Sequence, residues 1–218
     1  MTDAIPDLST RRFGFLCYPG FEELDLIGPW EMATMWSSYA RGPQCLTIGP
    51  TTDPMRCAKG LAVVPAESLA TCPALDYLLV PGGFAAFEVM QDPALLGFVK
   101  RQARGARAVL SVCTGSFILH AAGLLEGRRA TTHWKALPRL RALPGVTVEE
   151  ARWTRDGMIW TSAGVSAGID LLLGFIATEA GEAAASQVQW NAEYYPDSRA
   201  YGAAHRDTAA PGYLRAAE

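Results

Sequence analysis

The 218-residue sequence lacks the features that mark nucleic-acid binding, secretion or membrane insertion. Its net charge is −3 and no cluster of Lys and Arg forms a basic stripe, so we expect no nucleic-acid partner. The first residues contain neither a basic segment nor an apolar one, and Asp170 interrupts the most apolar late stretch, 168–180. We therefore expect no signal peptide, no membrane span and a soluble protein.

Cysteine is also scarce. The five cysteines form an odd set with no Cys-x-x-Cys pair. Half of the residues are hydrophobic, so the chain can build a core without disulfides. This predicts reduced thiols, a cytoplasmic location and no structural zinc.

Short apolar runs alternate along the chain with stretches of helical spacing. Strands are predicted over 13–17, 44–48, 61–64, 76–80 and 106–112, with a hairpin over 152–161. Helices are predicted over 25–36, 87–104 with a restart at Asp92-Pro93, 114–125, 134–143, 166–179 and 182–194. This alternation predicts an α/β fold, a doubly wound and mostly parallel sheet with helices on both faces.

No linker-like run divides the chain, so we expect a single domain over 1–218. Its globular part is expected over about 12–196. The stretch 197–218 is rich in Ala, Gly and polar residues, which is typical of an arm or a loosely ordered tail.

Three predicted loops follow strand ends and carry residues of chemical interest. Asp25 follows the first strand, Gly82-Gly83 the strand that ends at Val80, and Cys113 the strand that ends at Val112. Ligands of an open parallel sheet bind beyond the carboxyl ends of its strands. If these strands are neighbours, all three loops open into one pocket.

Cys113 is the candidate nucleophile. It stands at a sharp strand-to-helix turn, where the small residues Ser111 and Gly115 permit the arrangement of a nucleophile elbow. The start of the following helix favours the thiolate, so we expect a lowered pKa. Thr114 comes next and can serve the pocket with its hydroxyl and N–H. The remaining cysteines, Cys17, Cys45, Cys57 and Cys72, are expected to be buried structural residues.

Asp25 and the two glycines have a functional and a structural interpretation each. Asp25 lies between two leucines, where partial desolvation would raise its pKa and suit it to proton transfer; alternatively it caps a helix. The N–H groups of Gly82 and Gly83 are free to face a developing negative charge, or they form a plain turn.

No histidine adjoins the cysteine, so a Cys-His dyad is not expected. His120 lies about two helical turns beyond Cys113 and is expected to pack, and His205 lies in the tail. His133 is the histidine that could edge the pocket. The small residues that end at Gly164 supply either another pocket wall or ordinary helix capping.

Four motifs occur in order and together resemble the ThiJ/PfpI superfamily. They are Leu24-Asp25-Leu26-Ile27-Gly28-Pro29, Val80-Pro81-Gly82-Gly83, Ser111-Val112-Cys113-Thr114-Gly115 and Arg128-Arg129-Ala130-Thr131-Thr132-His133-Trp134. The resemblance runs over about 13–194. It implies a flavodoxin-like fold, similar to class I glutamine amidotransferases, and a homodimer without a metal or organic cofactor.

Within the superfamily the sequence is most similar to the isocyanide hydratases. Peptidase-like and glyoxalase-like relatives place His after the cysteine and Glu at the early acidic position, where this sequence has Thr114 and Asp25. The resemblance implies that Cys113 attacks the isocyanide carbon and forms a thioimidate, that Asp25 transfers protons, and that a formamide is released. The N–H groups of Gly83 and Thr114 are expected to hold the intermediate.

Two alternatives stay open. The chain could be a ligand-sensing or redox-sensing module whose cysteine reacts without turnover, because an exposed thiol of low pKa serves that purpose too. Some AraC-type regulators are similar around the cysteine and the Arg-Arg-Ala-Thr-Thr-His-Trp segment, although no helix-turn-helix module is expected here. The other alternative is a glyoxalase-like hydrolyase, which the missing histidine disfavours.

Overall fold

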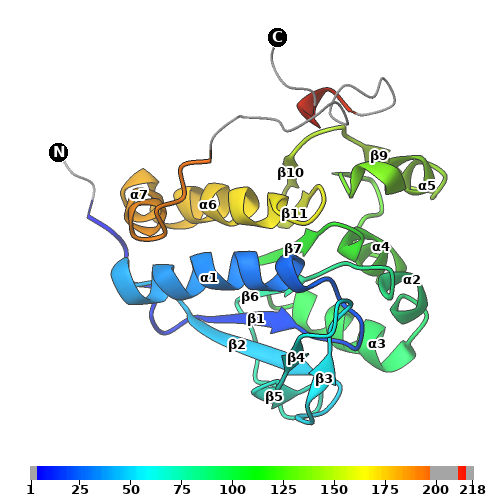
Figure 1. Ribbon diagram of the computed structural model, residues 1–218, viewed down its shortest axis with the longest axis horizontal. Helices are drawn as coiled ribbons and strands as arrows, with labels where there is room; N and C mark the ends of the chain where they lie inside the picture. The colour runs from blue at the N-terminus through cyan, green and yellow to red at the C-terminus, as the bar shows by residue number, and fades with distance from the viewer. Residues whose placement is uncertain (1–3, 197–210, 215–218) are drawn as a thin grey trace.

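A seven-stranded sheet forms the centre of the protein in a computed structural model that describes residues 4–196 and 211–214. The strand order is β10-β11-β7-β6-β1-β2-β5. All neighbouring strands are parallel except the hairpin of β10 and β11. Helices α1, α6 and α7 pack together along one side of this sheet, and α2, α3 and α4 lie along the other (Figure 1). The predicted doubly wound, flavodoxin-like α/β fold is confirmed.

The elements have the following bounds. The strands of the central sheet are β1 Arg12–Leu16, β2 Gln44–Gly49, β5 Glu67–Ser68, β6 Tyr77–Val80, β7 Ala108–Val112, β10 Trp153–Asp156 and β11 Ile159–Ser162. Two small sheets pair β3 Met55–Arg56 with β4 Ala62–Val63, and β8 Arg128–Ala130 with β9 Val146–Val148. The helices are α1 Glu23–Tyr39, α2 Ala86–Val89, α3 Pro93–Ala103, α4 Gly115–Ala121, α5 Leu137–Arg141, α6 Ala167–Ala180 and α7 Glu182–Asn191, with 3-10 turns η1 Trp134–Ala136 and η3 Gly212–Leu214.

The structure corrects several predicted extents. The strand predicted over 61–64 lies outside the central sheet, because β4 pairs with β3. The helix predicted over 87–104 is two helices, and Asp92 caps the second by accepting the N–H groups of Ala94 and Leu95. Helix α4 stops at Ala121, well before 125, because Gly123 turns the chain with a φ of 73°.

One prediction concerns a part of the chain that lies almost wholly outside the described residues. The arm predicted over 197–218 lies outside the described residues, apart from the turn at Gly212–Leu214.

The strands β8 and β9 were not predicted from sequence, because each has three residues and neither shows a clear alternation. In the described part of the chain, no helix is both long and apolar enough to span a membrane.

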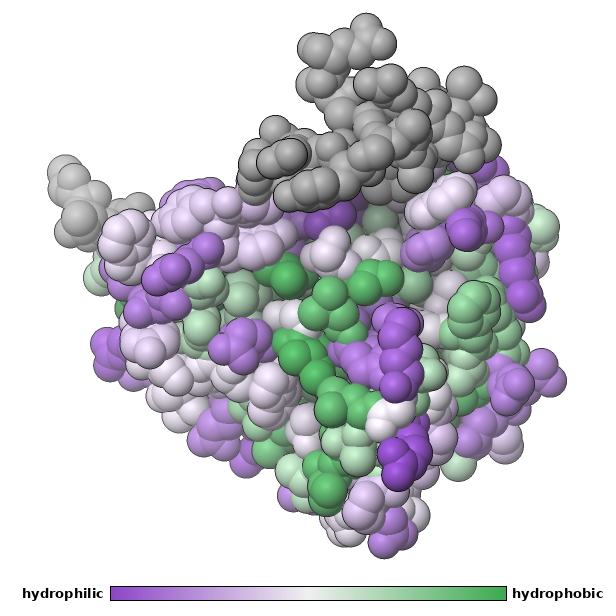
Figure 2. All heavy atoms as spheres, viewed as in Figure 1, coloured by the Kyte–Doolittle hydropathy of each residue, from purple (hydrophilic) through white to green (hydrophobic). Residues whose placement is uncertain are grey.

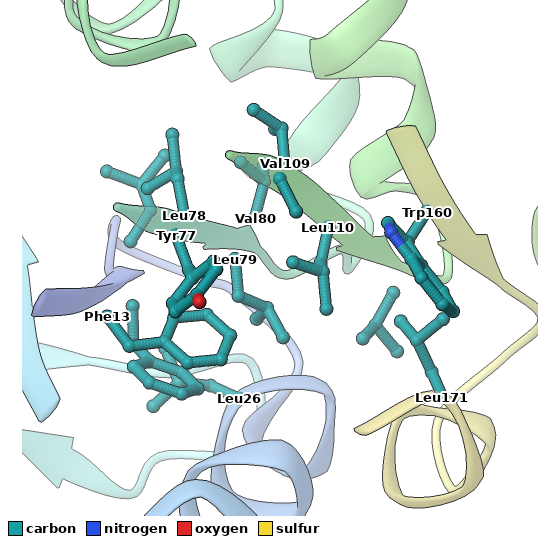
Figure 3. Packing of buried hydrophobic residues seen from close by; sticks show 14 of the residues in the cluster. Phe13, Leu26, Tyr77, Leu78, Leu79, Val80, Val109, Leu110, Trp160 and Leu171 are labelled. Atoms are coloured by element: carbon teal, nitrogen blue, oxygen red, sulfur yellow. The ribbon is translucent and has the colours of Figure 1, made fainter. Parts of the chain in front are cut away.

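The core lies on both faces of β6 and β7, whose residues are all buried. Phe175 on α6 packs its ring against Phe13, Tyr77 and Trp160, with centroid distances of 5.9, 5.2 and 5.3 Å. Figure 3 shows Phe13 and Tyr77 side by side near Leu26 on α1, and Trp160 beside Leu171 on α6. This aromatic cluster fastens α1 and α6 to the sheet.

Some large hydrophobic side chains face solvent instead. Figure 2 shows a strip of them that runs from the start of α1 over β3 and β4. Among the exposed large hydrophobic residues, Leu24, Leu61 and Val64 are exposed by 38, 46 and 61%. Contiguous exposed apolar surface of this kind is typical of protein interfaces.

We predict that Phe175→Ala lowers the free energy of unfolding by about 3–5 kcal/mol, because it leaves a cavity among four aromatic rings. Urea denaturation followed by circular dichroism measures the change. Trp190→Ala is the matched control: Trp190 is 70% exposed, and its loss should change stability by less than about 0.5 kcal/mol. Equal effects of the two substitutions would contradict the packing described here.

Candidate active site

Cys113 occupies a sharp turn between β7 and α4. Its φ is +57°, a left-handed conformation that costs a non-glycine residue energy and is typical of functional sites. Its N–H donates to the carbonyls of Ser162 and Ala163, and its own carbonyl accepts the Thr132 hydroxyl at 2.8 Å. A Cβ at Gly115 would lie 2.3 Å from the Val80 carbonyl, so only glycine fits beside the turn. This is the turn that Ser111 and Gly115 predicted.

The Asp25 carboxyl lies in the interior beside this cysteine. Asp25 is fully buried in the first turn of α1, and its Oδ2 accepts the Gly82 N–H at 2.9 Å. Among the described residues its Oδ1 has no hydrogen-bond partner. The alternative of a capping residue is wrong, because the N-cap position belongs to Glu22.

Burial raises the pKa of Asp25 to about 7. The Gly82 N–H opposes this rise, and the charge of Glu22 adds to it. A carboxyl with this pKa gives and takes protons at neutral pH.

The Cys113 thiol has a raised pKa, not a lowered one. Burial and the nearby Asp25 charge raise it to about 12, although the Thr114 N–H and side chain and the Val165 N–H lower it in part. The predicted lowering by the helix end is wrong because the cysteine is only 6% exposed and α4 has only seven residues. At neutral pH the pair therefore holds its proton on sulfur, next to a carboxyl that is partly ionised.

The two glycines are brought to the site, but their N–H groups are already bonded. The Gly82 N–H binds Asp25, and the Gly83 N–H donates to the Thr114 hydroxyl at 2.9 Å. That hydroxyl donates in turn to the Gly83 carbonyl at 2.8 Å. The expectation that Gly82 and Gly83 present free N–H groups to an anion is therefore wrong. A Cβ at Gly82 would lie 2.5 Å from the Thr114 nitrogen, so glycine allows this close approach.

Sequence analysis missed two residues that surround the Cys113 and Asp25 pair. The buried Tyr18 hydroxyl donates to the carbonyls of Pro81 and Gly82, at 2.8 and 3.0 Å, and so holds the loop that binds Asp25. Tyr18 directly follows the first strand, so the rule that singled out Asp25 applied to it too. Val165 directs its N–H at Cys113 from a left-handed conformation, φ +52°. Nothing in the sequence marks a valine for that conformation.

His133 and Gly164 lie together at the side of the site. A Cβ at Gly164 would lie 2.1 Å from Cδ2 of His133, so the glycine makes room for the imidazole. His133 Nδ1 accepts the Lys135 N–H at 3.2 Å, and burial lowers the pKa of the ring. Among the hydrogen bonds of the described residues, His133 makes none to Cys113. His120 lies away from the site and contacts the Pro144 carbonyl.

A cavity of about 320 Å³ opens over the cysteine. It is lined by Glu22, Gly83, Phe84, Phe87, Cys113, Thr114, His133, Lys135, Ala136, Arg139 and Val165. Within residues 4–196 and 211–214, no three His, Cys, Asp or Glu side chains are grouped to hold a metal ion. The cavity thus gives access to the Cys113 thiol, and the Asp25 carboxyl lies behind it, outside the lining.

Comparison with known proteins identifies the family. The model of the DJ-1/PfpI family matches residues 11–178. The isonitrile hydratase of Pseudomonas putida is 38% identical over 185 residues, which cover 85% of this chain and 79% of that enzyme. The HTH-type transcriptional regulator CdhR of Pseudomonas aeruginosa is 32% identical over 82% of this chain, which spans 54% of the regulator.

Solved structures show the same fold. A THiJ/PfpI family protein from Pseudomonas syringae superposes with a TM-score of 0.86 at 34% identity, over 98% of this chain and 86% of that one. DJ-1beta of Drosophila melanogaster superposes with a TM-score of 0.76 at 17% identity, over 86% of this chain and 100% of DJ-1beta. At this low identity the superposition shows a shared fold and nothing about function. The resemblance inferred from the four sequence motifs is confirmed.

The buried carboxyl generates a prediction about stability. Below about pH 4, Asp25 is protonated in the folded and the unfolded chain, whereas between pH 4 and 7 only the unfolded chain ionises. Wild type therefore loses stability as the pH rises through this window. Asp25→Asn does not titrate, so between pH 4 and pH 8 its stability relative to wild type should rise by on the order of 4 kcal/mol, since about three pKa units separate the two states.

Urea denaturation of both proteins from pH 4 to pH 8 measures this difference. Asp7→Asn is the control, because a hydrogen bond from Ser9 lowers the pKa of that exposed carboxyl and places its titration below this pH range, so its stability relative to wild type should stay nearly constant. A difference between Asp25→Asn and wild type that stays constant over the whole pH range would show that Asp25 does not titrate in the interior.

Proposed function

Because the chain belongs to the DJ-1/PfpI family, we propose that it is an isocyanide hydratase, which converts an isocyanide and water to an N-substituted formamide. The observation that carries the proposal is the buried pair of Cys113 and Asp25, with Thr114 in the position where glyoxalase-like relatives have His. The identity of 38% to an isonitrile hydratase supports it.

The first step joins the substrate to the thiol. The isocyanide carbon accepts a bond from the Cys113 sulfur while the thiol proton passes through Asp25 to that carbon. The product is a thioimidate, in which the former isocyanide carbon carries hydrogen, sulfur and a double bond to nitrogen. The raised pKa of Asp25, about 7, suits it to accept and release this proton at neutral pH.

The second step consumes water. Asp25 removes a proton from a water molecule that attacks the thioimidate carbon, and the nitrogen takes up that proton. The carbon–sulfur bond of the tetrahedral adduct then breaks, the sulfur regains a proton from the new hydroxyl through Asp25, and the N-substituted formamide leaves. One isocyanide and one water are consumed, and the thiol and the carboxyl return to their starting protonation.

The backbone donors around the sulfur act at bond cleavage. The N–H groups of Thr114 and Val165 point at the sulfur, where negative charge develops as the carbon–sulfur bond breaks. They therefore stabilise the leaving thiolate. This replaces the role expected for the Gly83 N–H, which binds the Thr114 hydroxyl.

Ligand sensing without turnover is the second candidate, favoured by the identity of 32% to a transcriptional regulator. Redox sensing fits less well, because a buried thiol of raised pKa reacts slowly with oxidants.

We also propose that the protein is a homodimer. The exposed hydrophobic residues Leu24, Leu61 and Val64 form the surface that best fits its interface.

Incubation with a simple alkyl isocyanide should yield the N-alkylformamide, measured by mass spectrometry. Cys113→Ala should lower the rate by roughly 10³-fold or more, and Asp25→Asn by roughly 10²- to 10⁴-fold. Cys72→Ala and Asp92→Asn are matched controls away from the cavity and should retain the wild-type rate, since Asn still caps α3. Absence of product from folded wild type would leave ligand sensing as the better function.

Thr114 gives a separate test of positioning. Thr114→Val removes both hydrogen bonds to Gly83 and should lower kcat by about tenfold. Thr114→Ser keeps the hydroxyl and should stay near wild type. Wild-type activity in Thr114→Val would show that the hydroxyl is not what the site requires.

A further inference from the structure

The cavity has a closed end and an open mouth, and the two differ in chemistry. Cys113 and Thr114 are buried, and Gly83 is hydrogen-bonded to Thr114, so these lining residues mark the closed end. Phe84, whose side chain is 91% exposed, lies at the mouth together with Arg139. In the proposed reaction the terminal isocyanide carbon bonds to Cys113, so the substituent on nitrogen must extend towards the mouth. The mouth residues therefore select the substituent.

Aromatic rings and cations are combined at the mouth. Phe84 and Phe87 both line the cavity. The Arg139 guanidinium lies 3.8 Å from the centroid of the Phe87 ring, close enough for a cation–π contact that holds it in place. Lys135 Nζ lies 5.2 Å from the centroid of Trp134.

The charges around the cavity do not cancel. Glu22 is the acidic residue of the lining, and it forms an ion pair with Lys59. Within the described part of the chain, neither Arg139 nor Lys135 has a carboxylate within ion-pair distance. His133 adds no charge at neutral pH, because burial lowers the pKa of its ring. Two cations thus face the opening without an anion to neutralise them.

We infer that the preferred substrates are aryl isocyanides that carry an anionic group such as a carboxylate, an assignment that rests on the proposed hydratase function. The aryl ring covers the exposed Phe84 and lies against Phe87. The carboxylate then meets Arg139, with Lys135 nearby, in a charge-assisted hydrogen bond. A neutral alkyl substituent uses neither the rings nor the cations.

The test compares 4-isocyanobenzoate with its methyl ester, which has the same ring and no charge. We expect kcat/KM of wild type to favour the acid by about tenfold, mainly through KM, and this ratio to shrink at high ionic strength. Arg139→Gln should bring the ratio close to one, and Lys135→Gln should lower it part of the way. Both variants should lower kcat/KM less for the ester than for the acid.

Arg155→Gln is the matched control. Arg155 also stacks on an aromatic ring, at 4.8 Å from the centroid of Trp160, but it does not line the cavity. Its loss removes the same charge and should leave the preference for the acid unchanged. An equal loss of preference in Arg155→Gln would mean that net charge, not the mouth, attracts the acid.

The outcomes separate the two proposals. Equal hydration of acid and ester by wild type would overturn this inference and leave the hydratase function standing. Hydration of neither compound would overturn the hydratase function. In that case the relative rates at which iodoacetate and iodoacetamide alkylate Cys113 still test the mouth: Arg139→Gln should slow the anionic reagent selectively, and an unchanged ratio would contradict the cationic mouth.

Discussion

The hydrogen bond from the Gly82 N–H to the Asp25 carboxylate keeps an ionisable group in the interior, and the site is arranged around it. The bond joins residues 57 positions apart. It requires a glycine at position 82, because a side chain there would meet both Thr114 and Asp25. Tyr18 holds the carbonyls of the same loop, and Thr114 ties down Gly83. The carboxyl is thereby fixed beside the thiol, and neither group can ionise without affecting the pKa of the other.

Much of the fold could be predicted because the signals are local. Buried parallel strands read as continuous apolar runs, and β6 and β7 were found in this way. The short pairs β3 with β4 and β8 with β9 could not be found, because two or three residues carry no periodicity. The placement of β4 outside the central sheet depends on its contact with β3, which no pattern within 61–64 reveals.

The residues of the site and the raised pKa of Asp25 were easier to predict than the protonation of Cys113. Strand ends and small neighbours pointed to Cys113, Asp25 and the glycine pair, and the structure brings them together. The sign of the cysteine pKa shift could not be predicted, because it depends on burial and on the distance to Asp25, whereas the sequence shows only the nearby helix start. The glycine N–H groups looked free because their acceptors come from Asp25 and Thr114, on other segments. Val165 was not predicted either, because its left-handed backbone conformation arises only in the folded chain.

The strand order has a consequence for the newly made chain. The site loops follow β1, β6, β7 and β11, so the cysteine meets its acid only after strands distant in sequence have paired. Such pairing is slow compared with local helix formation. Until it is complete, Cys113 is an ordinary solvent-exposed thiol, more acidic and more easily oxidised than in the folded protein. The nascent chain is therefore the form most vulnerable to oxidants during synthesis, and the completed fold protects its own nucleophile.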